Sequence, residues 1–204
     1  PKLALQPLKE EYLLTGPLES TNDAYAIAKI AGLMMCDAYN RQHGTRFIAA
    51  MPTNLYGPGD NFDLQNSHVL PALIRKFVEA KAAGQGAVEL WGTGTPRREF
   101  LYVDDLADAL VFLMDHFEPA ARDVFVNVGT GTDVTIAELA ALVASAVGYD
   151  GAICWNTAMP DGTPQKLLDV SRMTALGWTA QTALEDGVAK TVEWYATRPT
   201  SGNP

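Results

Sequence analysis

The sequence is poor in the residues that build disulfides and metal sites. It has only two cysteines, Cys36 and Cys154, and three histidines among its 204 residues. Because the two cysteines lie far apart, we expect buried small apolar residues in a reducing compartment rather than a disulfide, and a cytoplasmic protein. His, Cys and carboxylate residues do not show the spacing of a metal site, so we expect no bound metal.

Long apolar runs and an excess of basic charge are also missing. The sequence has no stretch of eighteen apolar residues, so we expect no membrane-spanning helix. Its 15 Lys and Arg residues are outnumbered by 24 Asp and Glu residues, which gives a net charge of −9. A nucleic-acid-binding surface needs a basic patch, so we expect no nucleic-acid partner. This charge still allows a locally positive pocket for a small anionic molecule.

A complete glycine-rich phosphate loop is the third absence. No Gly-x-Gly-x-x-Gly follows a predicted strand, and Gly129-Thr-Gly131 lacks the third glycine. The sequence begins at Pro1 rather than at a methionine, and residues 1–16 have the character of a loop. We therefore expect the front of a larger protein to be missing, or to be supplied by a separate N-terminal segment.

Predicted helices and strands alternate along the rest of the sequence. The apolar spacing predicts helices over 25–42, 68–83, 104–116, 135–147, 171–177 and 182–196, and strands or extended segments over 46–51, 87–91, 100–103, 123–128, 152–155 and 166–170. Residues 52–58 contain Pro and Gly and are predicted to be a loop. This alternation predicts an α/β class with a parallel sheet, whose binding loops lie at the carboxyl ends of the strands.

Local side-chain patterns predict where several of these helices begin. Asp104 and Asp105 are interpreted as helix-capping residues rather than catalytic ones, because carboxylates are stabilising at a helix start. Thr135-x-x-Glu138 and Thr182-x-x-Glu185 both match the capping box, in which each side chain bonds the other residue's backbone N–H.

Tyr25 and Lys29 are the first candidates for chemistry. They are four residues apart in a predicted helix, so they share one helical face. A free tyrosine has a pKa of about 10, and a nearby cation favours the phenolate. Such a pair can give a proton to a carbonyl that is being reduced, or take one from an alcohol. Taken alone, the simpler interpretation is a core aromatic residue and a solvated lysine.

Further motifs follow this pair in a recognisable order. They are Asn22-Asp-Ala-Tyr25-Ala-Ile-Ala-Lys29, Pro52-Thr-Asn-Leu-Tyr-Gly-Pro58, Asn66-Ser-His68, Trp91-Gly-Thr-Gly-Thr-Pro-Arg-Arg98-Glu-Phe-Leu-Tyr-Val-Asp-Asp105, Val126-Asn-Val-Gly-Thr-Gly131 and Pro160-Asp-Gly-Thr-Pro-Gln-Lys166. Over nearly the whole chain this set resembles the extended short-chain dehydrogenase/reductase superfamily, and more closely the GDP-L-fucose synthase family. Tyr-x-x-x-Lys and Arg-Glu-Phe-x-x-Val-Asp-Asp indicate only the superfamily, whereas the His68 and Pro160 motifs are more specific.

The resemblance implies a partial Rossmann-type parallel sheet without its N-terminal strands, followed by a smaller C-terminal α/β lobe. Residues 1–60 would belong to the NAD(P)-binding domain. Residues 61–204 would form mainly the substrate lobe, with 92–130 partly returning to the first domain. The implied reaction is the NADPH-dependent 3,5-epimerisation and 4-keto reduction of GDP-4-keto-6-deoxy-D-mannose to GDP-L-fucose.

The resemblance also implies roles for particular residues. Tyr25 would donate a proton, Lys29 would bind the cofactor ribose and favour the phenolate, and His68 would act as the acid/base of epimerisation. The residues expected to contact NADP(H) are Lys29, Pro52, Thr53, Asn54, Leu55 and His68. Those expected to contact the GDP-sugar are Asn54, Lys76, Trp91, Arg98, Asp161 and Lys166, although the family pattern has Arg at the position of Lys76. A Ser and a Cys that act on the substrate would precede Pro1.

Several alternatives remain open. His68 could simply be a polar residue at a helix start, and Trp91 could be a core residue. The small-residue side of the first helix (Ala24, Ala28, Ala31, Gly32) could pack on the sheet or, as the family suggests, help form a homodimer. The protein could instead be a nucleotide-sugar 4-epimerase or 4,6-dehydratase with tightly bound NAD, or a non-catalytic nucleotide-sugar-binding module.

Overall fold

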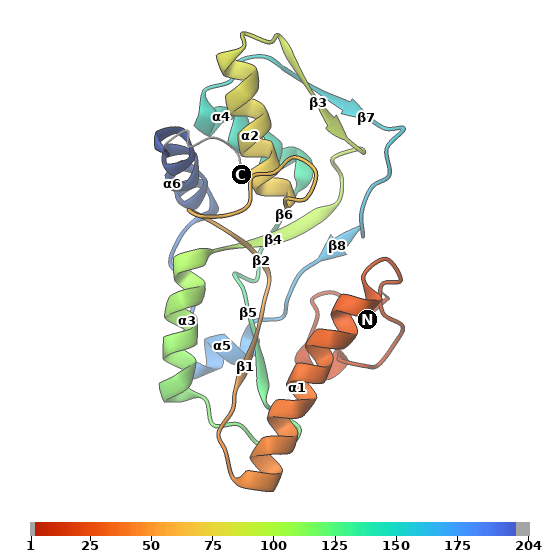
Figure 1. Ribbon diagram of the computed structural model, residues 1–204, viewed down its shortest axis with the longest axis vertical. Helices are drawn as coiled ribbons and strands as arrows, with labels where there is room; N and C mark the ends of the chain where they lie inside the picture. The colour runs from red at the N-terminus through yellow and green to blue at the C-terminus, as the bar shows by residue number, and fades with distance from the viewer. Residues whose placement is uncertain (1–2, 199–204) are drawn as a thin grey trace.

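The structure is a computed structural model, and it describes residues 3–198. Figure 1 shows two lobes along the longest axis of the molecule. The upper lobe contains α2 (Val69–Ala82), α4 (Ile136–Val147) and α6 (Leu184–Thr197) with the strands β3 (Ala87–Trp91) and β7 (Ala152–Asn156). The lower lobe contains α1 (Asp23–His43), α3 (Val103–His116) and α5 (Ser171–Leu176) with β1 (Ala49–Pro52) and β5 (Phe125–Val128). A 3₁₀ turn, η1 (Glu10–Tyr12), precedes α1.

Short parallel strand pairs form the framework of both lobes. β1 pairs with β5 in the lower lobe, and β3 pairs with β7 in the upper lobe, both in parallel. Between the lobes, β4 (Arg97–Tyr102) pairs in parallel with β2 (Asn54–Tyr56) and β8 (Gln165–Lys166), and antiparallel with β6 (Asp133–Thr135). This arrangement confirms the predicted α/β class with mainly parallel strands. In the part of the chain that the structure describes, no helix is both long and apolar enough to cross a bilayer.

Strand β4 joins the two hydrophobic cores. Phe100 and Tyr102 pack into the upper core, whereas Leu101 packs into the lower core. This division follows from the geometry of a strand, because successive side chains point to opposite faces. The two lobes therefore share one element, and a shift in the position of β4 would move side chains in both cores.

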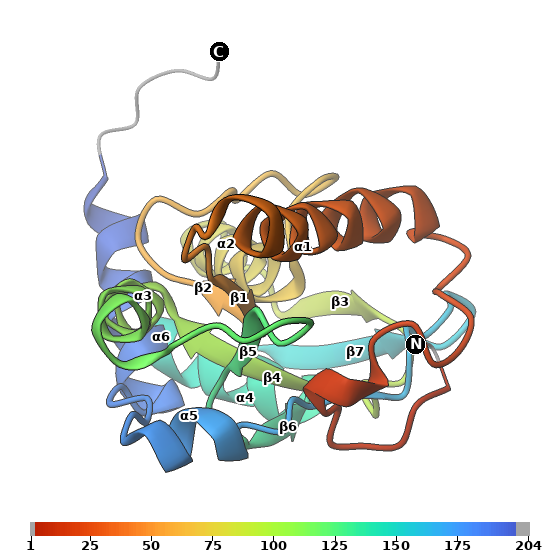
Figure 2. The same cartoon turned by 90° about the horizontal axis from the view of Figure 1, so that it is seen from below.

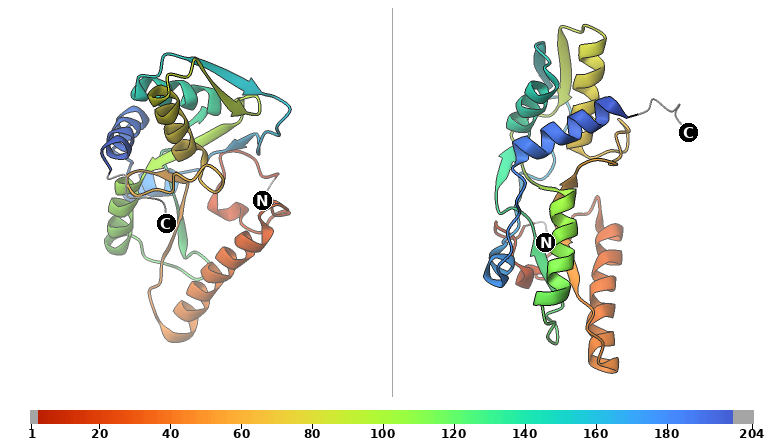
Figure 3. Two further views of the ribbon diagram at one scale, coloured as in Figure 1. Left: turned by 45° about the horizontal axis from the view of Figure 1, so that its top comes forward. Right: turned by 90° about the vertical axis from the view of Figure 1, so that its left-hand side faces the viewer.

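The helices lie on both sides of the strands. Figure 2 shows α1 and α2 on one side of the strands and α4 and α5 on the other. The right-hand view of Figure 3 shows the β1–β5 pair between α1 and α5. Tyr25 lies in α1, and His68 directly precedes α2, so both residues belong to segments on the same side of the strands.

Several local predictions prove wrong, beginning with the loop 52–58 and the capping roles of Asp104 and Asp105. The predicted loop 52–58 contains β2, because pairing with β4 holds Asn54–Tyr56 extended. Helix α3 begins at Val103 after Tyr102, so Asp104 is not its N-cap residue, and no side chain caps this helix. Instead of capping, the Asp105 carboxylate accepts hydrogen bonds from the backbone N–H of Gln181 (3.2 Å) and from the backbone N–H and hydroxyl of Thr182 (2.9 and 3.0 Å).

The Asp105–Thr182 contact also explains why only one capping box forms. Thr135 Oγ1 accepts the Glu138 N–H at 3.0 Å and Glu138 Oε2 accepts the Thr135 N–H at 2.7 Å, which confirms the first box. Helix α6 begins at Leu184 without a side-chain cap, so the second predicted box is wrong.

Cys154 is exposed rather than buried, and Cys36 is half-buried; both thiols are free. Within residues 3–198 no cluster of His, Cys and carboxylate residues could hold a metal ion.

Candidate functional site

Tyr25 and Lys29 lie near the start of α1 and face the same way. The Lys29 Nζ atom is 5.4 Å from the centroid of the Tyr25 ring, as a four-residue spacing allows. The Tyr25 side chain is 60% exposed, so it is not the core aromatic residue of the simpler interpretation. Among the described residues, the Lys29 ammonium forms no hydrogen bond or ion pair, so its three N–H donors are available to a ligand.

The rest of the molecule holds α1 mainly by its C-terminal half. Asp37 accepts the backbone N–H of Arg122 at 2.7 Å, and Asn40 exchanges two 2.8 Å hydrogen bonds with the backbone of Phe47. The Arg122 N–H, followed by the Arg41 guanidinium, lowers the pKa of the Asp37 carboxyl below its ordinary value, although burial opposes this. The N-terminal half of α1, which carries Tyr25, extends away from these contacts (Figure 1).

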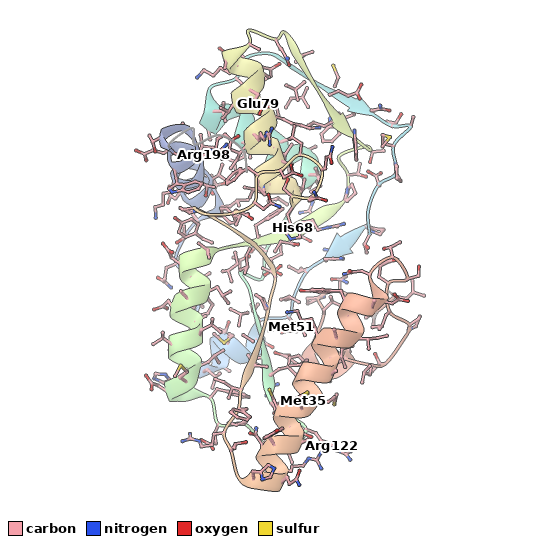
Figure 4. The ribbon with its side chains drawn as sticks, viewed as in Figure 1. Met35, Met51, His68, Glu79, Arg122 and Arg198 are labelled. Carbon is pink, nitrogen blue, oxygen red and sulfur yellow. The ribbon has the colours of Figure 1, made fainter. Side chains whose placement is uncertain are left out.

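His68 occupies the N-cap position of α2 but does not cap the helix. Its backbone is extended, with φ −70° and ψ 165°, and its side chain makes no capping hydrogen bond. Figure 4 shows His68 at the lower end of α2, where the upper lobe meets the strands between the lobes. The residue is exposed, so its imidazole is accessible. Within residues 3–198 no hydrogen bond or ring contact joins this imidazole to the Tyr25 phenol.

The segment 52–55 lies at the carboxyl end of β1, which is the usual location of binding loops in α/β sheets. Pro52 is exposed, and Leu55 is half-buried in β2. The Thr53 hydroxyl and the Asn54 amide both donate to the Glu99 carbonyl, at 3.2 and 2.8 Å. These two predicted ligands therefore already hold β2 against β4, while the Asn54 carboxamide oxygen stays available as an acceptor.

Lys76 and Trp91 form a contact between α2 and the end of β3. Lys76 Nζ is 5.9 Å from the Trp91 ring centroid and donates to the Glu89 carbonyl at 3.2 Å. Trp91 is 65% exposed, so the alternative that it is a core residue is wrong. An exposed indole with a cation beside it offers a surface on which a base or a sugar can stack.

Asp161 has a structural role in the neighbouring loop. Its carboxylate accepts the hydroxyl and the backbone N–H of Thr93 at 2.7 and 2.9 Å, and these bonds lower the pKa of its carboxyl. A Cβ on Gly92, whose φ is +79°, would lie 2.2 Å from Asp161 Oδ1, so this close approach requires glycine. Asp161 therefore holds the loop after Trp91 against the loop that leads to Lys166.

Arg98 and Lys166 form the most conspicuous electrostatic feature of the surface. They are register partners in the parallel pair β4–β8, so their side chains leave the same face. Burial lowers the pKa of the half-buried Arg98 guanidinium. The pKa of the Lys166 amine is lowered by loss of hydration and then by the charge of Arg98, with Glu19 partly offsetting both. Neither cation forms an ion pair with a carboxylate in the described part of the chain, so the two together favour an anion.

The backbone of Gly129-Thr-Gly131 is not available to a phosphate. The N–H groups of Thr130 and Gly131 donate to Glu99 Oε1 at 2.7 and 2.8 Å. An internal carboxylate thus occupies the anion-binding position of this loop. Sequence reasoning did not identify Glu99 as a site residue, although the Arg-Glu-Phe motif contains it.

A cavity of about 510 Å³ lies beside β4. Its lining includes Arg98, Phe100, Thr130, Trp178 and Thr182, but not Tyr25, Lys29 or His68. The cavity therefore adjoins one predicted substrate ligand, Arg98, but none of the predicted catalytic residues.

Comparison with known proteins identifies the family. The sequence model described as the NAD dependent epimerase/dehydratase family matches residues 1–129. The chain belongs to the NAD-dependent epimerase/dehydratase family. It is 57% identical over 195 residues to a probable GDP-L-fucose synthase of Oryza sativa subsp. japonica, and 51% identical over 205 residues to the GDP-L-fucose synthase of Escherichia coli strain K12. Both alignments cover 96% of this chain.

A solved structure from this family has the same fold. The GDP-L-fucose synthetase of Naegleria fowleri bound to NADP superposes with a TM-score of 0.89 at 30% identity, covering 96% of this chain and 62% of that one. The chain spans 58% of the length of the rice relative and 63% of the E. coli one. The predicted resemblance to GDP-L-fucose synthases is therefore confirmed over the length of this chain.

Proposed function

We propose that the protein carrying this chain converts GDP-4-keto-6-deoxy-D-mannose to GDP-L-fucose, using NADPH. One observation carries the proposal: Tyr25 and the unpaired ammonium of Lys29 share an exposed face of α1 in a chain that closely matches GDP-L-fucose synthases. A phenol next to a cation is suited to proton transfer to a carbonyl oxygen.

NADP(H) is the proposed cofactor, and the residues present fit its ribose and nicotinamide end. Lys29 offers unpaired donors, and Pro52–Leu55 with His68 supply polar and apolar groups near the carboxyl end of β1. When bound, NADPH supplies the hydride for reduction of the C4 ketone. The Thr130 and Gly131 amides would not contribute to pyrophosphate binding, because they donate to Glu99.

Side chains of this chain would transfer protons in both the epimerisation and the reduction. The His68 imidazole accepts a proton from the carbon next to the ketone, and a second acid on the opposite face, which is not among the residues assigned in this chain, returns a proton and inverts that centre. As the ketone is reduced, the Tyr25 hydroxyl gives its proton to the carbonyl oxygen. The Lys29 ammonium then stabilises the phenolate that remains.

The GDP-sugar would bind along the surface from α2 to β8. Arg98 and Lys166 bind the diphosphate. Trp91 offers an aromatic face to the base or a sugar, and Lys76 beside it supplies a point charge. Asp161 supports the loop between these groups, and Asn54 lies beside the reacting sugar. We accordingly assign cofactor binding mainly to residues 1–60 and substrate binding mainly to 61–204, with 92–130 shared because β5 pairs with β1.

The direct test is NADPH oxidation in the presence of GDP-4-keto-6-deoxy-D-mannose. Stoichiometric NADPH consumption with formation of GDP-L-fucose is the expected result. No NADPH consumption with this keto-sugar, together with conversion of a nucleotide-sugar that carries a C4 hydroxyl, would identify a 4-epimerase or 4,6-dehydratase instead. GDP binding without deuterium incorporation at C3 or C5 would indicate a non-catalytic binding module.

A further inference from the structure

Glu99 is a fully buried carboxylate at the point where the two lobes meet. Its side chain is 0% exposed, and it lies on β4 directly after Arg98. Within residues 3–198 it forms no ion pair. Its Oε1 accepts the N–H groups of Thr130 and Gly131 and, at 3.4 Å, the Thr130 hydroxyl, and its Oε2 accepts the Leu168 N–H at 2.9 Å. Burying a charged group costs free energy unless the group is hydrogen-bonded. Breaking these bonds would therefore be unfavourable, and they hold the two loops against Glu99.

The loop after β5 is shaped to wrap this carboxylate. A Cβ added to Gly129 would lie 2.2 Å from Glu99 Oε1, so only glycine permits the approach. Gly131 has a φ of +71°, a left-handed conformation that favours glycine. Gly129 and Gly131 therefore allow the loop to close around the Glu99 carboxylate.

The bond to Leu168 is one of the hydrogen bonds that hold the chain after Lys166; others join Leu167 and Asp169 to residues 6–8. Strand β8 pairs with β4 only at Gln165 and Lys166. Beyond Lys166 the Leu168 N–H donates to the Glu99 side chain rather than to a backbone carbonyl of β4. The Glu99 carboxylate is thus the anchor on the β4 side for the chain just after Lys166, and it contributes to the position of Lys166 beside Arg98.

The backbone of the same residue reaches the predicted cofactor segment. The Glu99 carbonyl accepts the Thr53 hydroxyl and the Asn54 amide at 3.2 and 2.8 Å. One residue therefore links three segments that are far apart in sequence: the start of β2, the loop after β5 and the end of β8.

We propose that Glu99 is a positioning residue for diphosphate binding: by holding the Leu168 amide it sets the spacing between Arg98 and Lys166. This inference rests on the proposed function, because it takes these two cations as ligands of the nucleotide-sugar diphosphate. Glu99 itself is enclosed behind the loops and does not touch the ligand.

A double-mutant cycle on GDP binding tests the proposal with the full chain. We expect Glu99→Gln to weaken GDP binding about tenfold, because the Gln side chain replaces one acceptor with a donor that faces the N–H groups. Lys166→Met should also cost about tenfold in the unmodified background, but less than about twofold in the Glu99→Gln background. Calorimetric titration of the four proteins with GDP measures the cycle. If Glu99→Gln does not fold, Leu168→Pro is used in the same cycle, because proline lacks the N–H that donates to Glu99 Oε2.

Glu10→Gln is the matched control. Glu10 is also buried, and among the residues that the structure describes its carboxylate accepts one hydrogen bond, from the Asn127 N–H at 2.9 Å. We expect this variant to lose thermal stability without a change in GDP affinity. An additive cycle, in which Lys166→Met costs the same factor in both backgrounds, would overturn the positioning role and leave the proposed reaction standing. A failure of the unmodified chain to bind GDP would overturn both.

Discussion

At the scale of single residues, the exposed position of Tyr25 permits a clean test of its role. Because the ring lies in solvent rather than in a core, Tyr25→Phe removes one oxygen without disturbing packing. Turnover in NADPH oxidation should fall about 10²–10⁴-fold, the usual worth of general-acid help. GDP affinity and melting temperature should stay unchanged. Turnover within a few-fold of the unmodified protein would show that the phenol does not supply the proton.

The lowered pKa of the Lys166 amine predicts how GDP affinity depends on pH. The protonated amine binds the diphosphate, so affinity is steady near neutral pH and declines as the pH rises through this pKa. Because loss of hydration and the charge of Arg98 place that pKa below the ordinary lysine value of 10.5, the decline begins earlier than for a free lysine. Calorimetry at increasing pH measures the decline. In Lys166→Met this component of the pH dependence should disappear; an unchanged profile would contradict the assignment.

At the scale of elements, two glycine substitutions separate a required glycine from a replaceable one. Gly129→Ala places a methyl group against Glu99 and should destabilise the protein by about 1–3 kcal/mol, as overpacking does. Gly32→Ala is its control: it lies within α1 with nothing within 4 Å of the new Cβ, and alanine should stabilise the helix by up to about 1 kcal/mol. Denaturant unfolding measures both changes. Equal effects would contradict the close contact between Glu99 and the loop.

The elements that could be predicted are those fixed by neighbours in the sequence. The Thr135–Glu138 capping box and the stop of α1 at Gly44 depend on residues within one turn, so the sequence alone indicates them. Strands β2 and β6 were not predicted, because each is held extended by pairing with a distant strand, β4. Thr182 matched a capping pattern but bonds Asp105 on α3, a partner that no local pattern contains.

The same distinction applies to the candidate site. The Tyr25–Lys29 face follows from helical spacing, so it could be derived from the sequence. That Arg98 lies beside Lys166, and that Glu99 holds the loops around them, depends on the pairing of β4 with β8. The resemblance indicated Arg98 and Lys166, but only the structure identifies the carboxylate that links them.

At the scale of the whole molecule, α1 predicts self-association. Its exposed large apolar side chains are Tyr25, Ile27, Met34, Met35 and Tyr39. Exposed apolar surface of this kind marks an interaction site, and we predict a two-fold dimer formed through α1. Light scattering should give the dimer mass, and Met35→Glu (Figure 4 shows Met35 on α1) should shift it towards the monomer. Met114→Glu is the control and should not, because Met114 lies on α3 and is even more exposed than Met35. A monomer at all concentrations would contradict the prediction.

The account as a whole requires that Tyr25, Lys29 and His68 serve one reaction on one sugar. The most direct measurement is mass spectrometry of the product formed from GDP-4-keto-6-deoxy-D-mannose and NADPH in D₂O, with the unmodified protein and with Tyr25→Phe and His68→Gln. We predict a reduced product carrying deuterium at C3 and C5 from the unmodified protein. Tyr25→Phe should keep the exchange but lose the reduction, and His68→Gln should lose the exchange. Full exchange and reduction in both variants would contradict the account.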